Sequence, residues 1–152
     1  MVLTHMGHTI DLIQREVTKV MSDLFVSYQS ADPLAHSVQV RFHQWASHNW
    51  DFPTVSFHEQ EPPVRFTERG AGRIKRELLR EIKRSQQLLV MISRTTWQSE
   101  WTDWEISMAL AHDKQLLAAK LDSTSIVPLG LLSTKPVWID PFDPVMLTQR
   151  RF

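Results

Sequence analysis

The chain has 152 residues, of which 42% are hydrophobic, and its 17 basic and 17 acidic side chains give a formal net charge of zero. This length and composition are typical of one globular domain, and the neutrality argues against a surface built to attract nucleic acid or an anionic membrane. There is no cysteine, which excludes disulfides, thiolate catalysis and cysteine-ligated metal and leads us to expect a reducing, cytoplasmic location.

The first predicted element is an amphipathic helix over Thr9–Met21. Its apolar residues recur at helical spacing: Ile10, Ile13, Val17, Val20 and Met21. The N-terminal sequence has no continuous apolar core of a secretion signal, and no run approaches the roughly 20 apolar residues that span a bilayer. We therefore expect a soluble protein with a single domain over residues 1–152, made of a helical extension at 1–22 and a core at 24–141.

The core begins with a short apolar strand, Leu24–Tyr28, followed by a helix over Leu34–Trp45 and a second strand over Thr54–His58. The segment Glu59–Gly72 carries two prolines and two glycines and is predicted to be a loop.

A strongly amphipathic helix over Arg73–Gln86 comes next, followed by a third strand, Leu88–Ser93. A helix over Ser99–Lys114 leads to strands at Leu116–Leu121 and Pro136–Asp140. Strands and helices that alternate with short connections predict a parallel sheet with helices on both faces. The expected fold is a flavodoxin-like, three-layer α/β/α domain with about five parallel strands and the extra N-terminal helix.

Ligands of such sheets bind where the strands end, which directs attention to the loops Gln29–Pro33, Glu59–Gly72 and Arg94–Trp101. We expect these loops to converge on one cleft. The helix after the third strand contains an acid, Glu105, within the apolar run "WEISMALA". An unpaired buried carboxylate is costly, so Glu105 is either paired at the surface or part of the wall of that cleft.

These residues resemble the TIR domains, and more narrowly the bacterial TIR-like proteins of the Thoeris anti-phage system. The first strand ends in Ser27 and Tyr28, with an acid, Asp32, four residues later. The following helix carries Arg41 and Trp45. The helix after the third strand has a Trp, three residues and a Glu, here Trp101 and Glu105. The resemblance runs from Leu24 to about Leu121.

The resemblance implies that Glu105 is the catalytic residue of an NAD nucleosidase of the ADP-ribosyl cyclase type. Ser27, Tyr28, Asp32, His58 and Trp101 are then expected to bind the substrate, with NAD consumed rather than held as a cofactor. It further implies self-association, a nucleotide product derived from ADP-ribose and cyclic, a separate effector that senses it, and a phage-derived trigger.

Each of these residues also has a purely structural interpretation. Ser27 and Tyr28 could simply end a strand, Asp32 could cap a helix, His58 could lie at the surface, and the tryptophans could fill the core. Trp104 is expected to be core, whereas Trp101 is in line with Glu105. The histidine pairs His43/His48 and His5/His8 lack accompanying carboxylates, so we expect no metal site.

Two other functions remain open from the sequence. A non-catalytic TIR-type interaction module would keep the fold without needing Glu105. A nucleoside-processing transferase would also use a glutamate on an N-glycosidic bond, but with free nucleosides as substrates.

Overall fold

The computed structural model describes residues 23–48, 52–143 and 145–148, so the predicted helix Thr9–Met21 lies outside the described residues. Five strands form one sheet: β1 (Leu24–Tyr28), β2 (Val55–Glu59), β3 (Gln87–Ile92), β4 (Gln115–Lys120) and β5 (Val137–Trp138). Their order is β2-β1-β3-β4-β5, and every pairing is parallel. The predicted flavodoxin-like fold is confirmed.

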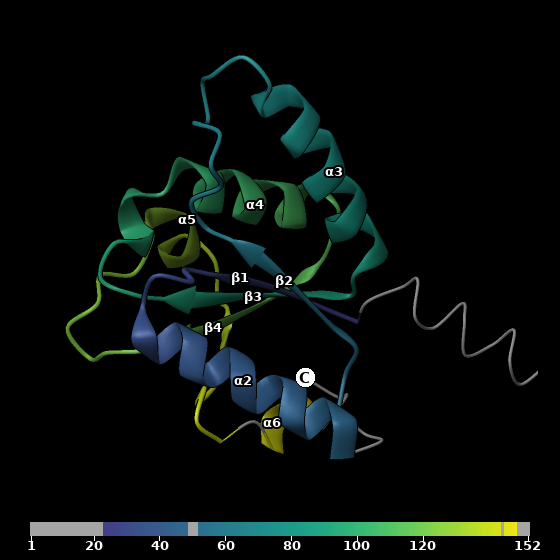
Figure 1. Cartoon of the computed structure of the whole chain (residues 1–152), viewed down its shortest axis with the longest axis vertical. Helices are drawn as coiled ribbons and strands as arrows, with labels where there is room; N and C mark the ends of the chain where they lie inside the picture. The colour runs from purple at the N-terminus through teal and green to yellow at the C-terminus, as the bar shows by residue number, and fades with distance from the viewer. Residues whose placement is uncertain (1–22, 49–51, 144, 149–152) are drawn as a thin grey trace, which may run out of the picture.

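Helices cover both faces of the sheet (Figure 1). One face carries α2 (Pro33–His48) and α6 (Val145–Thr148). The other face carries α3 (Ala71–Arg84), α4 (Glu100–Ala111) and the short α5 (Leu129–Leu132). A 3-10 turn, η1 (Thr96–Gln98), and α5 are elements that the periodicity did not predict, since each is a single turn too short to show a repeat.

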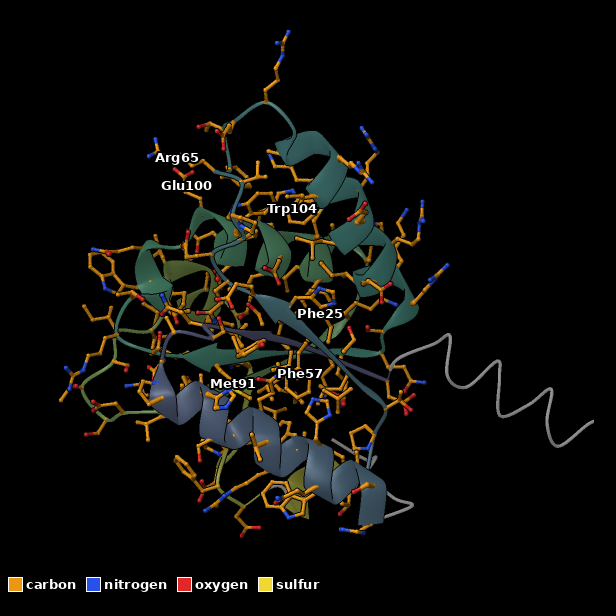
Figure 2. All side chains as sticks on the ribbon, viewed as in Figure 1. Phe25, Phe57, Arg65, Met91, Glu100 and Trp104 are labelled. Carbon is orange, nitrogen blue, oxygen red and sulfur yellow. The ribbon has the colours of Figure 1, made fainter. Side chains whose placement is uncertain are left out.

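The core is divided by the sheet into two clusters of buried residues. Leu24 and Val26 of β1 pack under α2, whereas Phe25 belongs to the cluster beneath α3 and α4. Figure 2 shows this split in two labelled rings, with Phe25 on the α3/α4 side and Phe57 on the α2 side. Side chains alternate along a strand, so Ser27 shares the face of Phe25 and points toward α4. Among the described helices, none combines the length and the apolar character needed to cross a bilayer.

Candidate active site beneath the segment after the second strand

Glu105 lies in the middle of α4, a helix whose start is fixed by Ser99. The Ser99 hydroxyl accepts a hydrogen bond from Thr102 N over 3.1 Å and donates one to Gln60 O over 2.8 Å. This cap directs the apolar side of α4 onto the sheet, where Ile106 joins the core cluster of Phe25. Glu105, the residue before Ile106, is consequently buried, with 0% of its surface exposed.

Three buried polar side chains of this region lack a hydrogen-bond partner within the described residues. They are Ser27, Thr102 and both carboxyl oxygens of Glu105. Thr102 precedes Glu105 by three positions, which places both on one side of the helix. The Ser27 hydroxyl is near enough to lower the pKa of the Glu105 carboxyl, although the two groups do not form a hydrogen bond of ordinary geometry. Folded proteins leave very few buried polar groups unpaired, so this concentration makes the region a candidate functional site.

The protonation of Glu105 follows from its surroundings. Burial raises its pKa well above the usual 4.5, and the nearby Ser27 hydroxyl opposes this only in part. Burial therefore favours the neutral carboxyl over the carboxylate. A cation entering beside it would favour the carboxylate, because an opposite charge at short range stabilises the ionised form.

Residues 61–70, here called the covering segment, pack on Trp101 in the first turn of α4. The indole Nε1 of Trp101 donates a hydrogen bond to Val64 O over 3.1 Å. Phe66 packs edge-on against the Trp101 ring with 5.2 Å between centroids, and Lys75 Nζ lies 3.7 Å from the centre of the Phe66 ring. Trp101 is 1% exposed as a result, while Trp104, expected to be core, is only partly buried.

The switch point of the sheet holds a separate cleft of about 420 Å³. The loops after β1, β3 and β4 line it with residues that include Gln29, Asp32, Ser93, Arg94 and Asp122. Asp32 caps α2 there, since its Oδ1 accepts a hydrogen bond from Leu34 N over 2.9 Å.

Glu105 does not line this cleft. We expected three loops to converge on one cleft with Glu105 in its wall, and the structure differs from that expectation. The loops after β1 and β3 do meet at the switch point. The segment after β2 instead turns toward α3 and α4, because Gln60 anchors its start beside Ser27 and Met91 and the ring of Phe66 then packs on Trp101.

His58 and Tyr28 point to opposite faces of the sheet. His58 is paired in register with Ser27 and shares its face, with its ring stacked on Phe25 at 4.1 Å and its Nε2 2.8 Å from Ser56 Oγ. It borders a cavity of about 600 Å³ between β2 and α3, and burial lowers its pKa to about 4, so the ring is neutral. Tyr28 packs edge-on against Phe57 in the α2 cluster, away from Glu105.

The residues proposed from the sequence thus divide into three places. Ser27, His58, Trp101 and Glu105 lie on the α3/α4 face, Asp32 lies at the switch point, and Tyr28 lies on the α2 face. Sequence reasoning missed Gln60, Thr96, Ser99 and Thr102, all buried polar residues of the same region. Only Ser99 carried a signal, as a serine directly before an apolar helix. Within the described part of the chain, no three histidine, aspartate or glutamate side chains are grouped to hold a metal.

The 2-1-3-4-5 order of parallel strands is that of the flavodoxin-like folds, and the helix after β3 carries the buried Glu105. Residues 25–126 match the family model described as "Thoeris protein ThsB, TIR-like domain". The chain belongs to this family, and membership carries with it a role in anti-phage defence. No curated protein matches the chain.

Proposed function

We propose that the protein cleaves the bond between nicotinamide and ribose in NAD, with Glu105 as the catalytic residue. The observation that supports this most is the carboxyl of Glu105, fully buried and without a partner among the described residues, next to Ser27 and one turn after Trp101. A carboxyl in this setting costs stability, and enzymes commonly keep such groups where chemistry requires them.

The chemistry needs a fixed negative charge more than a proton donor. The C1′–N bond of NAD breaks with its electron pair passing to nicotinamide, which leaves as a neutral base. Positive charge then develops on the ribose, and an ionised Glu105 in a water-poor pocket stabilises it. An oxygen of water, or of a hydroxyl in the same molecule, forms the new bond to C1′, and its proton passes to the carboxylate or to solvent.

The substrate itself supplies the reason for Glu105 to ionise. The nicotinamide ring of NAD is cationic before cleavage, so its arrival beside the carboxyl lowers the pKa that burial has raised. The carboxylate then persists while the positive charge moves from the ring to the ribose. Trp101 offers an aromatic face beside this position, which suits both the cationic ring and the sugar.

Glu105 and Trp101 are both buried, so a substrate reaches them only after a movement. We propose that the covering segment, which packs on Trp101, is the part that moves. The contacts that hold it include the Trp101–Val64 hydrogen bond, the edge-on Phe66 ring and the Lys75 cation over that ring. Each is individually worth on the order of 1 kcal/mol, so a bound partner or trigger can open the segment at moderate cost.

By family, the product is expected to be an ADP-ribose derivative, cyclic in form, that acts as a signal for a separate effector. We propose that association between copies of the chain and a phage-derived component favour the open state. Mass spectrometry of the nucleotides formed from NAD identifies the product.

The deciding experiment compares nicotinamide release by the wild type and by Glu105→Gln. Glu100→Gln is the matched control, since Glu100 is an exposed acid in the first turn of the same helix. Loss of release in Glu105→Gln alone supports the proposal, and equal release by all three proteins rejects it. Free nucleosides offered in parallel separate NAD cleavage from a nucleoside transferase.

A non-catalytic interaction module is the second candidate, and one observation favours it. Glu105 is 0% exposed and lines neither the switch-point cleft nor the cavity beside His58. If the module interpretation holds, Glu105→Gln retains phage protection, and disruption of the covering segment abolishes it.

A further inference from the structure

We infer that Gln60 is a positioning residue that holds the Glu105 carboxyl against Ser27 while the covering segment opens. This inference rests on the proposed function of Glu105. Gln60 directly follows β2 and precedes the covering segment, and it is 1% exposed, an unusual environment for a glutamine in a connection between elements.

The side chain of Gln60 ties together the ends of two strands. Its amide nitrogen donates to Ser27 O over 3.2 Å and to Met91 O over 2.8 Å. Its amide oxygen accepts a hydrogen bond from Thr96 Oγ1 over 2.8 Å. Two donors and one acceptor are therefore used, linking β1, β3 and η1 through a single residue.

The backbone of Gln60 extends the same connection to the helix that carries Glu105. Its N–H donates to Tyr28 O over 2.7 Å, and its C=O accepts from the Ser99 hydroxyl over 2.8 Å. Ser99 is the N-cap of α4, and Glu105 follows it by six residues. One residue thus joins the strand that bears Ser27 to the start of the helix that bears Glu105.

The contacts of Gln60 differ in kind from those of the covering segment. Gln60 is held by five buried or backbone hydrogen bonds, whereas residues 61–70 rest on Trp101 through one hydrogen bond and aromatic contacts. We therefore propose that Gln60 stays in place when the covering segment moves. Rupture of its side-chain bonds would let α4 shift against β1, and small displacements of a catalytic group are costly in rate.

The test uses Gln60→Glu, which keeps the size of the side chain but cannot donate to Ser27 O and Met91 O when ionised. If Gln60→Glu does not fold, Gln60→Met is used in its place. The control for the added charge is Gln44→Glu, on the exposed side of α2. Circular dichroism fixes the folded fraction of each variant, and NAD cleavage is expressed per folded molecule. The expected result is a fall in kcat of about 10- to 100-fold with KM little changed.

A second readout does not depend on activity. Near pH 4.5, below the raised pKa of Glu105, the infrared C=O stretching band of the protonated carboxyl is assigned by its loss in Glu105→Gln. We expect this band to shift in the Gln60 variant but not in Gln44→Glu. Failure of the wild type to cleave NAD would reject the proposed function while leaving this test of Gln60 intact. An unshifted band overturns the inference, as does a change confined to KM or a loss that only follows the folded fraction.

Discussion

The indole nitrogen of Trp101 donates a hydrogen bond of 3.1 Å to the backbone carbonyl of Val64, and this contact joins α4 to the covering segment. Glu105 follows Trp101 by about one turn of the same helix and is itself fully buried. Burial is the main cause of the raised pKa of this carboxyl. If opening of the covering segment exposes this acid, as we propose, the same movement lowers the pKa of the carboxyl.

Phe66→Ala should release the covering segment. The variant loses the edge-on contact with Trp101 and the Lys75 cation–π contact, so we expect about 1–3 kcal/mol less stability toward urea. If NAD cleavage requires an open site, its rate should rise by up to about tenfold, since a larger fraction of molecules is competent to bind.

The control for that experiment is Phe142→Ala, which removes a partly exposed ring that contacts Arg41 on α2 rather than the covering segment. It should leave the rate of nicotinamide release unchanged. A Phe66→Ala variant that is folded but slower than the wild type would show that the segment helps catalysis in its closed position.

Glu105→Gln should stabilise the protein increasingly as the pH rises. The folded pKa of Glu105 lies well above 4.5, so above pH 4.5 the unfolded chain gives up a proton that the folded protein retains. The wild type accordingly loses stability as the pH rises toward the folded pKa, whereas the amide has no proton to lose. Urea unfolding across a pH series should show curves that coincide near pH 4 and separate above it. A variant less stable than the wild type at pH 8 contradicts the burial of a neutral carboxyl.

His58 should give the opposite pH dependence. Its pKa is about 4 in the folded protein against 6.5 for the free side chain, so the unfolded chain binds the extra proton between these values. Stability is then lost as the pH falls from 6.5 to 4, by up to about 3 kcal/mol. His58→Gln should remove this loss of stability at low pH and keep a hydrogen-bond partner for Ser56. The control His36→Gln, at an exposed position of α2, should retain the loss. The same slope in both variants would exclude a buried neutral His58.

The fold could be predicted from the sequence because its signals are local. The apolar run Leu24–Tyr28 coincides with β1, and the amphipathic repeat after Gly72 matches most of α3. The position of Glu105 within an apolar run of α4 left two possibilities, an acid paired at the surface and a buried one, and the structure has the acid buried.

The geometry around Glu105 could not be predicted in the same way, since it depends on contacts between segments distant in the chain. Val64 and Trp101 are 37 residues apart, and Gln60 reaches Met91 across 31. Nothing in the composition of Glu59–Gly72 distinguishes a solvated loop from one that packs on a helix. Tyr28 illustrates a related difficulty, because it neighbours Ser27 in β1 but its side chain lies on the opposite face of the sheet.

The most direct test of the account is nicotinamide release from NAD, measured with purified protein and with lysates of phage-infected cells that express it. The account predicts release by the wild type and by Glu100→Gln, and none above background by Glu105→Gln at equal folded concentration. Release by Glu105→Gln at the rate of the wild type would contradict it.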